Sequence, residues 1–384
     1  GPQKDEIKDK SEVKGWTGKI RVYDDDKYIY RYNAFNYRKS VPLAFVGYNA
    51  DDFIVLGAGL MMTSHGFQKF PYATHHQAVA RYASATNALE FIYDGIFTSA
   101  FMGLDFQLHL DIRDPRYTQN YFGLGNETEQ GSDDKDFNRV RIGHLGIHPE
   151  LSKTINNNTF SAGLFYQQYN VEETPERFIS DIPVNGLDPE IFENQDYTGI
   201  NARYQFDTRN SQTLPTRGLY WNTNASFYYN LDNAGKTFNQ ITSELSLFMS
   251  FKKPHRTVFA FRVGGSANIG DYEFFQASSL GGKTNLRGYR ATRFSGDASL
   301  YQNSEIRFKL FKFSTYISKG ELGVLAFNDI GRVWLEGENS NQWHHGYGGG
   351  IWASPFNIAV LSATYERSKD ELSGLFSLRF KYLF

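Results

Sequence analysis

Apolar and polar residues alternate with a period of two along most of this chain, and this pattern limits its possible folds more than any other feature. The alternation is clearest at the C-terminus, where the residues of one parity are Phe376, Leu378, Phe380, Tyr382 and Phe384. The intervening positions include Arg379 and Lys381. Because successive side chains of a β-strand point to opposite faces, this segment is predicted to be a strand with one apolar and one polar face.

Composition decides which kind of strand protein fits this pattern. Aromatic residues make up 16% of the chain, yet its mean hydropathy is −0.50. No stretch approaches the roughly 18 apolar residues of a membrane-spanning helix. Strands with one face in lipid and one in water explain both facts, although a soluble all-β sandwich or propeller also alternates. Charged residues such as Arg379 and Lys381 favour the barrel, because a wide wet lumen leaves them solvated.

About sixteen strands can be placed, most with the roughly 9–11 residues that a tilted strand needs to cross a bilayer. The expected ranges are 41–49, 53–64, 75–87, 88–100, 101–114, 138–151, 159–172, 197–209, 217–231, 237–253, 256–271, 298–313, 319–336, 343–355, 357–368 and 371–384. The odd-numbered connections include the long polar segments 115–137, 173–196 and 272–297, whereas the even-numbered ones are mostly short. This parity is typical of outer-membrane barrels with long extracellular loops and short periplasmic turns. The fold expected is therefore a sixteen-stranded antiparallel membrane barrel.

Glycines gather in one expected strand, at Gly346, Gly348, Gly349 and Gly350. Positions without side chains permit tight curvature or let another segment lie against the wall.

The most informative motif is Leu286-Arg287-Gly288-Tyr289, within the long connection between the eleventh and twelfth expected strands. It resembles the Arg-Gly-aromatic tip of the sixth extracellular loop in BamA/TamA-like barrels, the bacterial surface antigen barrels. The resemblance spans residues 41 to 384. It implies that the loop folds into the lumen, and that the function is insertion of outer-membrane proteins or translocation of a polypeptide.

A second motif supports the same family. Residues 327–334, with Asp329 and Gly331, resemble the Asp-x-Gly element whose aspartate accepts the loop arginine inside the lumen. A guanidinium carried into the barrel stays charged and pairs best with a carboxylate, so an Arg287–Asp329 contact is expected. The resemblance places Glu305 as a second acidic partner.

A third motif joins Asp207 and Arg209 to a following turn that contains Pro215 and Gly218. It is similar to the family's aspartate-arginine turn at the periplasmic end of strands eight and nine. Proline and glycine are also ordinary turn residues, so a plain turn explains part of this motif.

The two ends of the chain carry further expectations. Gly1-Pro2 is typical of the remnant left by a tag-removing protease, and residues 1–40 are interpreted as this remnant plus a linker or periplasmic lead-in before the barrel, 41–384. Outer-membrane barrels end similarly in an aromatic strand that the assembly machinery reads, which would make Phe380, Tyr382 and Phe384 an assembly signal. The segments 65–72 and 121–127 resemble Bacteroidota members in which the barrel follows a metallophosphoesterase domain.

Catalysis, metal binding and nucleic-acid binding find little support. The adjacent histidines of His75-His76 and of His344-His345 would point to opposite faces of a strand, which is poor geometry for joint ligation of a metal. No G-x-S-x-G nucleophile elbow occurs. Asp51-Asp52 and Asp133-Asp134 are interpreted as solvated loop charge. With a net charge of −2 and no basic tract, nothing indicates nucleic acid. No cofactor is expected.

Two functions therefore remain open. The first is an assembly or translocation barrel, whose seam beside the first strand would open or whose sixth loop would withdraw. Its partners would be outer-membrane lipids with lipopolysaccharide, the barrel-assembly machinery and a polypeptide substrate. The second is a passive outer-membrane anchor or pore that carries a periplasmic domain, which the family resemblance allows to be a metallophosphoesterase.

Overall fold

The computed structural model describes residues 37–49, 51–67, 69–129, 131, 132, 134–182, 186–233, 235–251, 255–282, 284–316, 318–356, 359–369, 374–379, 382 and 384. The described helical elements are the short 3-10 turns η2 (Phe178–Ser180), η3 (Pro189–Phe192) and η4 (Phe274–Gln276). None of the described helices is long and apolar enough to cross a membrane.

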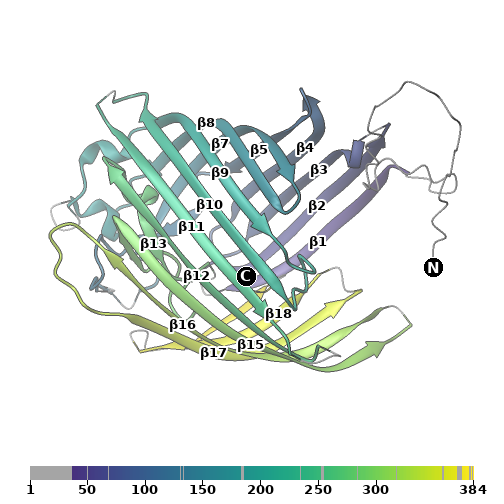
Figure 1. Ribbon diagram of the computed structural model, residues 1–384. Coiled ribbons are helices and arrows are strands. Elements are labelled where there is room, and N and C mark those ends of the chain that lie inside the picture. Colours follow the sequence, from purple (N-terminus) through teal and green to yellow (C-terminus); the bar gives the residue numbers. More distant parts are fainter. Residues whose placement is uncertain are drawn as a thin grey trace, which may run out of the picture.

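The chain forms a sixteen-stranded antiparallel barrel in which each strand pairs with the next along the sequence (Figure 1). The wall strands are β1 (Lys39–Asn49), β2 (Phe53–Gly66), β3 (Lys69–Ala83), β4 (Ala88–Phe101), β5 (Leu104–Arg113), β7 (Arg139–Ile155), β8 (Asn158–Glu172), β9 (Gln195–Asp207), β10 (Gly218–Asn230), β11 (Thr237–Met249), β12 (Thr257–Gly270), β15 (Ala298–Ser314), β16 (Lys319–Trp334), β17 (His344–Pro355), β18 (Leu361–Ser368) and β19 (Leu375–Arg379). The short β6 (Thr118–Asn120) continues the sheet beside β7, and β13 (Ser278–Leu280) pairs with β14 (Phe294–Gly296) in a separate small sheet. The predicted fold class and strand number are confirmed.

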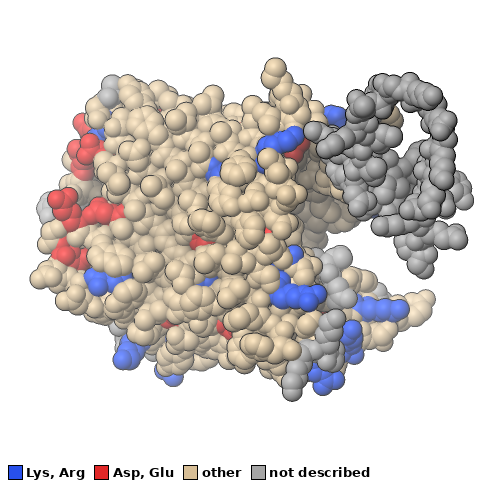
Figure 2. All heavy atoms as spheres, in the orientation of Figure 1, with Lys and Arg blue, Asp and Glu red and all other residues tan. Residues whose placement is uncertain are grey.

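The wall is apolar outside and polar inside, as its alternating sequence requires. On β15, Ile306 and Phe308 are 40% and 41% exposed, whereas Glu305 and Arg307 are 4% and 2% exposed. Figure 2 shows that the outer wall seen in this view carries few charged side chains between its two ends. A belt of this kind suits the hydrocarbon of a bilayer, with the ionisable groups kept inside the barrel.

The two ends of the barrel differ in their connections. One end, here called the loop end, carries the long segments 114–138, 173–194 and 271–297 between strands. The opposite turn end carries short connections such as 102–103 and 156–157. Acidic side chains gather at the loop end, at the left of Figure 2. The expected alternation of long and short connections is therefore present.

The barrel closes at a short seam between β1 and β19. Strand β1 pairs with β2 along its whole length, from Lys39–Thr63 to Asn49–Phe53. Among the described residues, its pairing with β19 consists of Tyr48 with Leu378. Most of this edge of β1 therefore lacks backbone partners within the described part of the chain.

The C-terminal residues depart from the sequence-based expectation. Strand β19 ends at Arg379, and Tyr382 is only 6% exposed, packed beside Trp352 on the inner wall. The Phe384 ring faces the Arg262 guanidinium at 5.0 Å. The prediction that Tyr382 and Phe384 continue the lipid-facing strand is therefore wrong, because cationic and aromatic side chains inside the barrel bind them. Phe380 lies outside the described residues.

A pair of cysteines tests the seam. Paired residues of antiparallel strands lie at Cα distances compatible with a disulfide, and the chain has no cysteine of its own. We expect Tyr48→Cys with Leu378→Cys to form a disulfide in the refolded, oxidised barrel, visible as a mobility change on a non-reducing gel. The matched pair Tyr48→Cys with Ser377→Cys should not form one, because residue 377 points to the opposite face. Equal yields from both pairs would contradict the register.

Candidate functional site: the loop between β12 and β15

The segment 271–297 packs against the inner wall through an apolar cluster. Leu280, Leu286, Tyr289 and Phe294 from the loop meet Val333 of β16, and all are at most 1% exposed. A Cβ added to Gly331 would lie 2.9 Å from the Leu280 side chain, so the wall is smooth where the loop approaches it. Apolar burial thus holds the loop beside β16.

Arg287 forms the most buried ionic contact of this loop. Its Nε donates to Oδ2 of Asp329 at 2.7 Å and its Nη2 donates to Oδ1 at 2.8 Å, a bidentate pair. The backbone N–H of Arg287 donates to the same carboxylate at 3.1 Å. Arg287 is 1% exposed and Asp329 is fully buried. The structure therefore brings together the arginine and the aspartate that the two motifs singled out.

Glu305 completes a charge-balanced group. It accepts a hydrogen bond at 2.5 Å from Nη1 of Arg287 and another at 2.6 Å from Nε of Arg307. The Arg287 guanidinium also lies 3.6 Å from the centre of the Phe327 ring. Two arginines thus face two carboxylates, and this balance offsets much of the cost of removing four charges from water. Arg307 was not singled out as a site residue from the sequence, although its position two residues from Glu305 puts it on the same face.

Glycine allows the loop backbone to approach the wall closely. Gly288 has φ +89°, and an added Cβ would lie 2.6 Å from the Arg367 carbonyl oxygen. A Cβ on Gly346 of β17 would lie 1.7 Å from the carbonyl oxygen of Arg287. The glycine-rich strand is therefore a place where another segment lies against the wall. Tyr289 extends past it and donates from its hydroxyl to the carbonyl oxygen of His345 at 3.3 Å.

The loop is also anchored at residues that sequence reasoning missed. Asp51, between β1 and β2, accepts from Nε of Arg290 at 3.0 Å and from the backbone N–H of Ala291 at 3.1 Å. The interpretation of Asp51 as solvated loop charge is therefore wrong. Glu366 of β18 accepts from the backbone N–H of Gly288 at 3.3 Å. Nothing in the local sequence marks either carboxylate as a loop partner.

The segment 121–127 helps to cover the loop end. Asn126 is fully buried, and its side-chain amide donates to Ser340 Oγ at 2.8 Å and to the Gln342 carbonyl at 2.9 Å. Its Oδ1 accepts from the backbone N–H of Val333 at 3.0 Å. One asparagine thus ties the connection 114–138 to β16 and to the connection after it.

The aspartate-arginine motif at the turn end forms a compact local structure. Arg209 donates from Nε and Nη2 to Asp207 at 3.0 and 2.7 Å. Gly218 has φ +112°, and an added Cβ would lie 2.4 Å from the Thr208 carbonyl oxygen. Beside Pro215, Leu214 packs against the apolar cluster that contains Trp352 and Tyr382. The turn therefore reaches from the β9–β10 end to the opposite wall.

The histidine pairs have the expected geometry. The His75 ring forms a hydrogen bond with the Thr63 hydroxyl, and the His76 ring forms one with the Tyr93 hydroxyl. The two neighbouring imidazoles therefore have different partners on opposite faces of the strand. His344 is 2% exposed, whereas His345 is exposed. Within the described part of the chain, no group of three or more histidine, aspartate or glutamate side chains is arranged to hold a metal ion.

These features define a transmembrane β-barrel with a long connection packed against its inner wall. The chain belongs to the Omp85 superfamily, because residues 97–378 match the Omp85 superfamily domain. Comparison with curated protein sequences gives no significant match.

Solved structures with the same fold include barrels of three bacterial proteins. BamA from Haemophilus ducreyi, in a form lacking POTRA domains 1–3, aligns with a TM-score of 0.64 and 14% identity over 88% of this chain and 69% of its own. CdiB from Acinetobacter baumannii gives a TM-score of 0.52 and 13% identity, over 90% of this chain and 59% of its own. CdiB from Escherichia coli gives a TM-score of 0.56 and 12% identity, over 89% of this chain and 62% of its own. This chain thus spans about three fifths of the CdiB chains that it resembles.

Removal of the buried arginine should destabilise the barrel strongly. In Arg287→Ala, Asp329 and Glu305 lose a buried partner, and we expect the free energy of unfolding in urea to fall by about 3–5 kcal/mol. Asp329→Ala should cost a similar amount, and the double variant should cost much less than the sum. Additive losses would contradict an energetic coupling. Arg116→Ala, which removes an exposed pair with Asp114, is the control and should cause no measurable loss.

A single methyl group on the wall should displace the loop. Gly346→Ala places a Cβ where the Arg287 carbonyl oxygen lies, so we expect about 1–3 kcal/mol of lost stability. Gly349→Ala in the same strand is the matched control, because its nearest neighbour would be 3.1 Å away. Limited proteolysis should cleave within 271–297 faster in Gly346→Ala than in Gly349→Ala. Equal cleavage would contradict the close approach.

Proposed function

We propose that this chain is the membrane barrel of a bacterial outer-membrane protein that inserts or translocates polypeptides, with the segment 271–297 as the plug of its lumen. In this proposal Arg287, Asp329 and Glu305 hold the plug, and Gly288, Tyr289 and Gly331 fit it to the wall. In this proposal the side chains of Arg287, Asp329 and Glu305 make and break no covalent bond. Its role is to fix the loop position and hence the state of the lumen and the seam.

One observation carries this proposal: the buried loop is connected to the strand that closes the barrel. The Gly288 N–H binds Glu366, and Glu366 also accepts from Nη2 of Arg379 at 2.7 Å. Arg379 is the last residue of β19, the strand on one side of the seam. A movement of the loop tip is thereby coupled to the edge that another chain could pair with.

Membership in the Omp85 superfamily and the fold shared with BamA and CdiB support the class of function. The outer membrane of a bacterium is then the compartment, with lipopolysaccharide and other lipids around the wall. The barrel-assembly machinery and a polypeptide substrate are the proposed partners. Tyr382 and Phe384, together with Phe380, remain candidates for the signal by which this barrel is itself assembled.

The alternative is a passive anchor or pore for a periplasmic domain, such as the metallophosphoesterase suggested by the resemblance to Bacteroidota proteins. The observation in its favour is the number of strong contacts that hold the loop. Besides Arg287, Arg290 binds Asp51, and Arg293 donates to the Thr128 carbonyl oxygen at 2.7 Å. A loop fixed at three arginines suits a permanently closed barrel.

Conductance and insertion assays distinguish the two functions. We expect the refolded wild-type barrel to conduct poorly in planar bilayers, and Arg287→Ala to raise the conductance several-fold because the plug is no longer held. Liposomes that contain the barrel should also accelerate the folding of an added outer-membrane barrel. Arg116→Ala should match the wild type in both assays. A large, steady wild-type conductance would exclude the plug, and unchanged folding rates would favour the passive anchor.

A further inference from the structure

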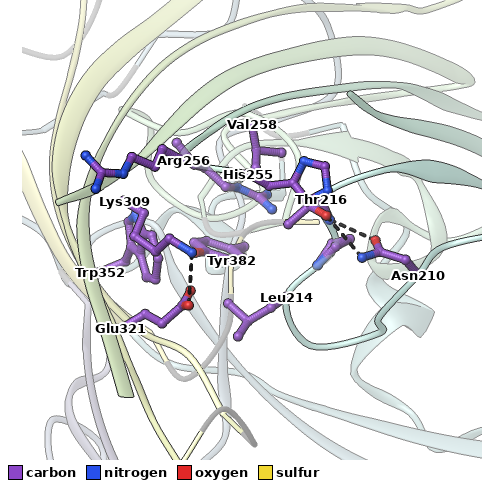
Figure 3. A pocket seen from close by; sticks show the side chains of 12 residues that line it. Asn210, Leu214, Thr216, His255, Arg256, Val258, Lys309, Glu321, Trp352 and Tyr382 are labelled. Atoms are coloured by element: carbon purple, nitrogen blue, oxygen red, sulfur yellow. Dashed lines mark hydrogen bonds and ion pairs between the residues drawn. The ribbon is translucent and has the colours of Figure 1, made fainter. Parts of the chain in front are cut away.

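A cavity of about 440 Å³ opens inside the barrel near its turn end (Figure 3). One side is formed by the turn residues Asn210, Leu214 and Thr216, and the other by side chains of β15, β16 and β17. Tyr382, after the end of β19, also lines it. This volume suits one small organic molecule.

The cavity presents one buried donor without a partner among the described residues and one exposed guanidinium. Arg307 is 2% exposed, and its Nη1 has no hydrogen-bond partner among the described residues. Arg256 lines the same cavity and is exposed, so water solvates its guanidinium when no ligand is bound. Nδ1 of His255 forms a hydrogen bond with the Ser250 hydroxyl. A buried donor left unpaired is costly, so an acceptor that reaches Nη1 of Arg307 gains free energy there.

The remaining charges of the cavity cancel one another. Glu321 is the carboxylate among the lining residues, and it accepts from Nζ of Lys309 at 3.0 Å, drawn as a dashed line in Figure 3. Lys312 lies 3.7 Å from the same carboxylate. With Glu321 neutralised in this way and Arg307 paired with Glu305, the positive charge that remains in the cavity lining is that of Arg256.

An apolar surface lies beside these donors. Trp352 and Tyr382 meet edge to face with ring centres 5.8 Å apart, and Leu214 packs against them. Both rings are nearly buried, at 4% and 6% exposure. A flat apolar group could therefore stack in the cavity while an acidic group attached to it reaches the arginines.

We propose that this cavity binds a small organic anion, a phosphate ester or carboxylate attached to a planar apolar group. The acidic group pairs with the Arg256 guanidinium, which suits planar bidentate recognition of these anions, and accepts a hydrogen bond from Nη1 of Arg307. The apolar group packs on Trp352, Tyr382 and Leu214. Because the ligand contacts both the 208–217 turn and the wall, its binding joins two elements at the turn end.

Calorimetric titration of the refolded barrel with three probes tests this site. Phenyl phosphate carries both chemical features, inorganic phosphate carries the anion alone, and benzyl alcohol carries the ring alone. We expect saturable one-to-one binding of phenyl phosphate, roughly tenfold weaker binding of inorganic phosphate, and no saturable binding of benzyl alcohol. A lack of saturable phenyl phosphate binding would overturn the proposal, as would equal affinity for the two phosphates.

A matched pair of variants identifies the site. Arg256→Ala should weaken phenyl phosphate binding roughly tenfold, because it removes one of the two guanidinium groups. Lys153→Ala removes the same charge from an exposed side chain near the end of β7, at the same end of the barrel but outside the cavity lining, and it should leave the affinity nearly unchanged. Equal weakening in both variants would mean that general surface charge attracts the ligand. Since only binding is measured, the outcome is independent of whether the barrel conducts or inserts polypeptides.

Discussion

The structure inside this barrel depends on a buried arginine that cannot lose its charge. Once Arg287 lies within the wall, it requires carboxylates, and Asp329 and Glu305 supply them. Arg307 then balances the second carboxylate and binds the Phe384 carbonyl oxygen at 2.9 Å. A continuous chain of hydrogen-bonded charged groups therefore extends from the loop between β12 and β15 to Phe384, and removal of one charged member would leave its partner buried and unpaired.

The fold was largely predictable because its physical signal is local. Alternation with a period of two sets which face of each strand meets lipid. The long connections, which all lie at one end, show which connections are loops and which are turns. The Arg287–Asp329 contact was predictable from paired motifs together with the rule that a buried guanidinium needs a carboxylate. The glycine-rich strand also predicted a close approach of another segment, since Gly346 lies where the loop backbone comes closest to the wall.

The parts that sequence did not reveal depend on contacts between distant segments. Asp51 binds a residue 239 positions away, and no local pattern separates it from a solvated loop aspartate. Tyr382 and Phe384 keep the alternation of a lipid-facing strand, yet cation–π contacts with Arg307 and Arg262 hold them inside. Periodicity records which residues can share a face, but not where the chain leaves the sheet.

The position of Asp51 gives the loop a second role in the integrity of the barrel. Asp51 lies at the bend between β1 and β2, on one side of the junction, while Glu366 and Arg379 lie on the other. The loop between β12 and β15 holds both sides, so it acts as a clasp across the place where the ring of strands is least continuous. The barrel is then closed twice, once by backbone pairing and once by side chains, and release of the loop would leave the short backbone pairing of β1 with β19 as the remaining closure among the described residues.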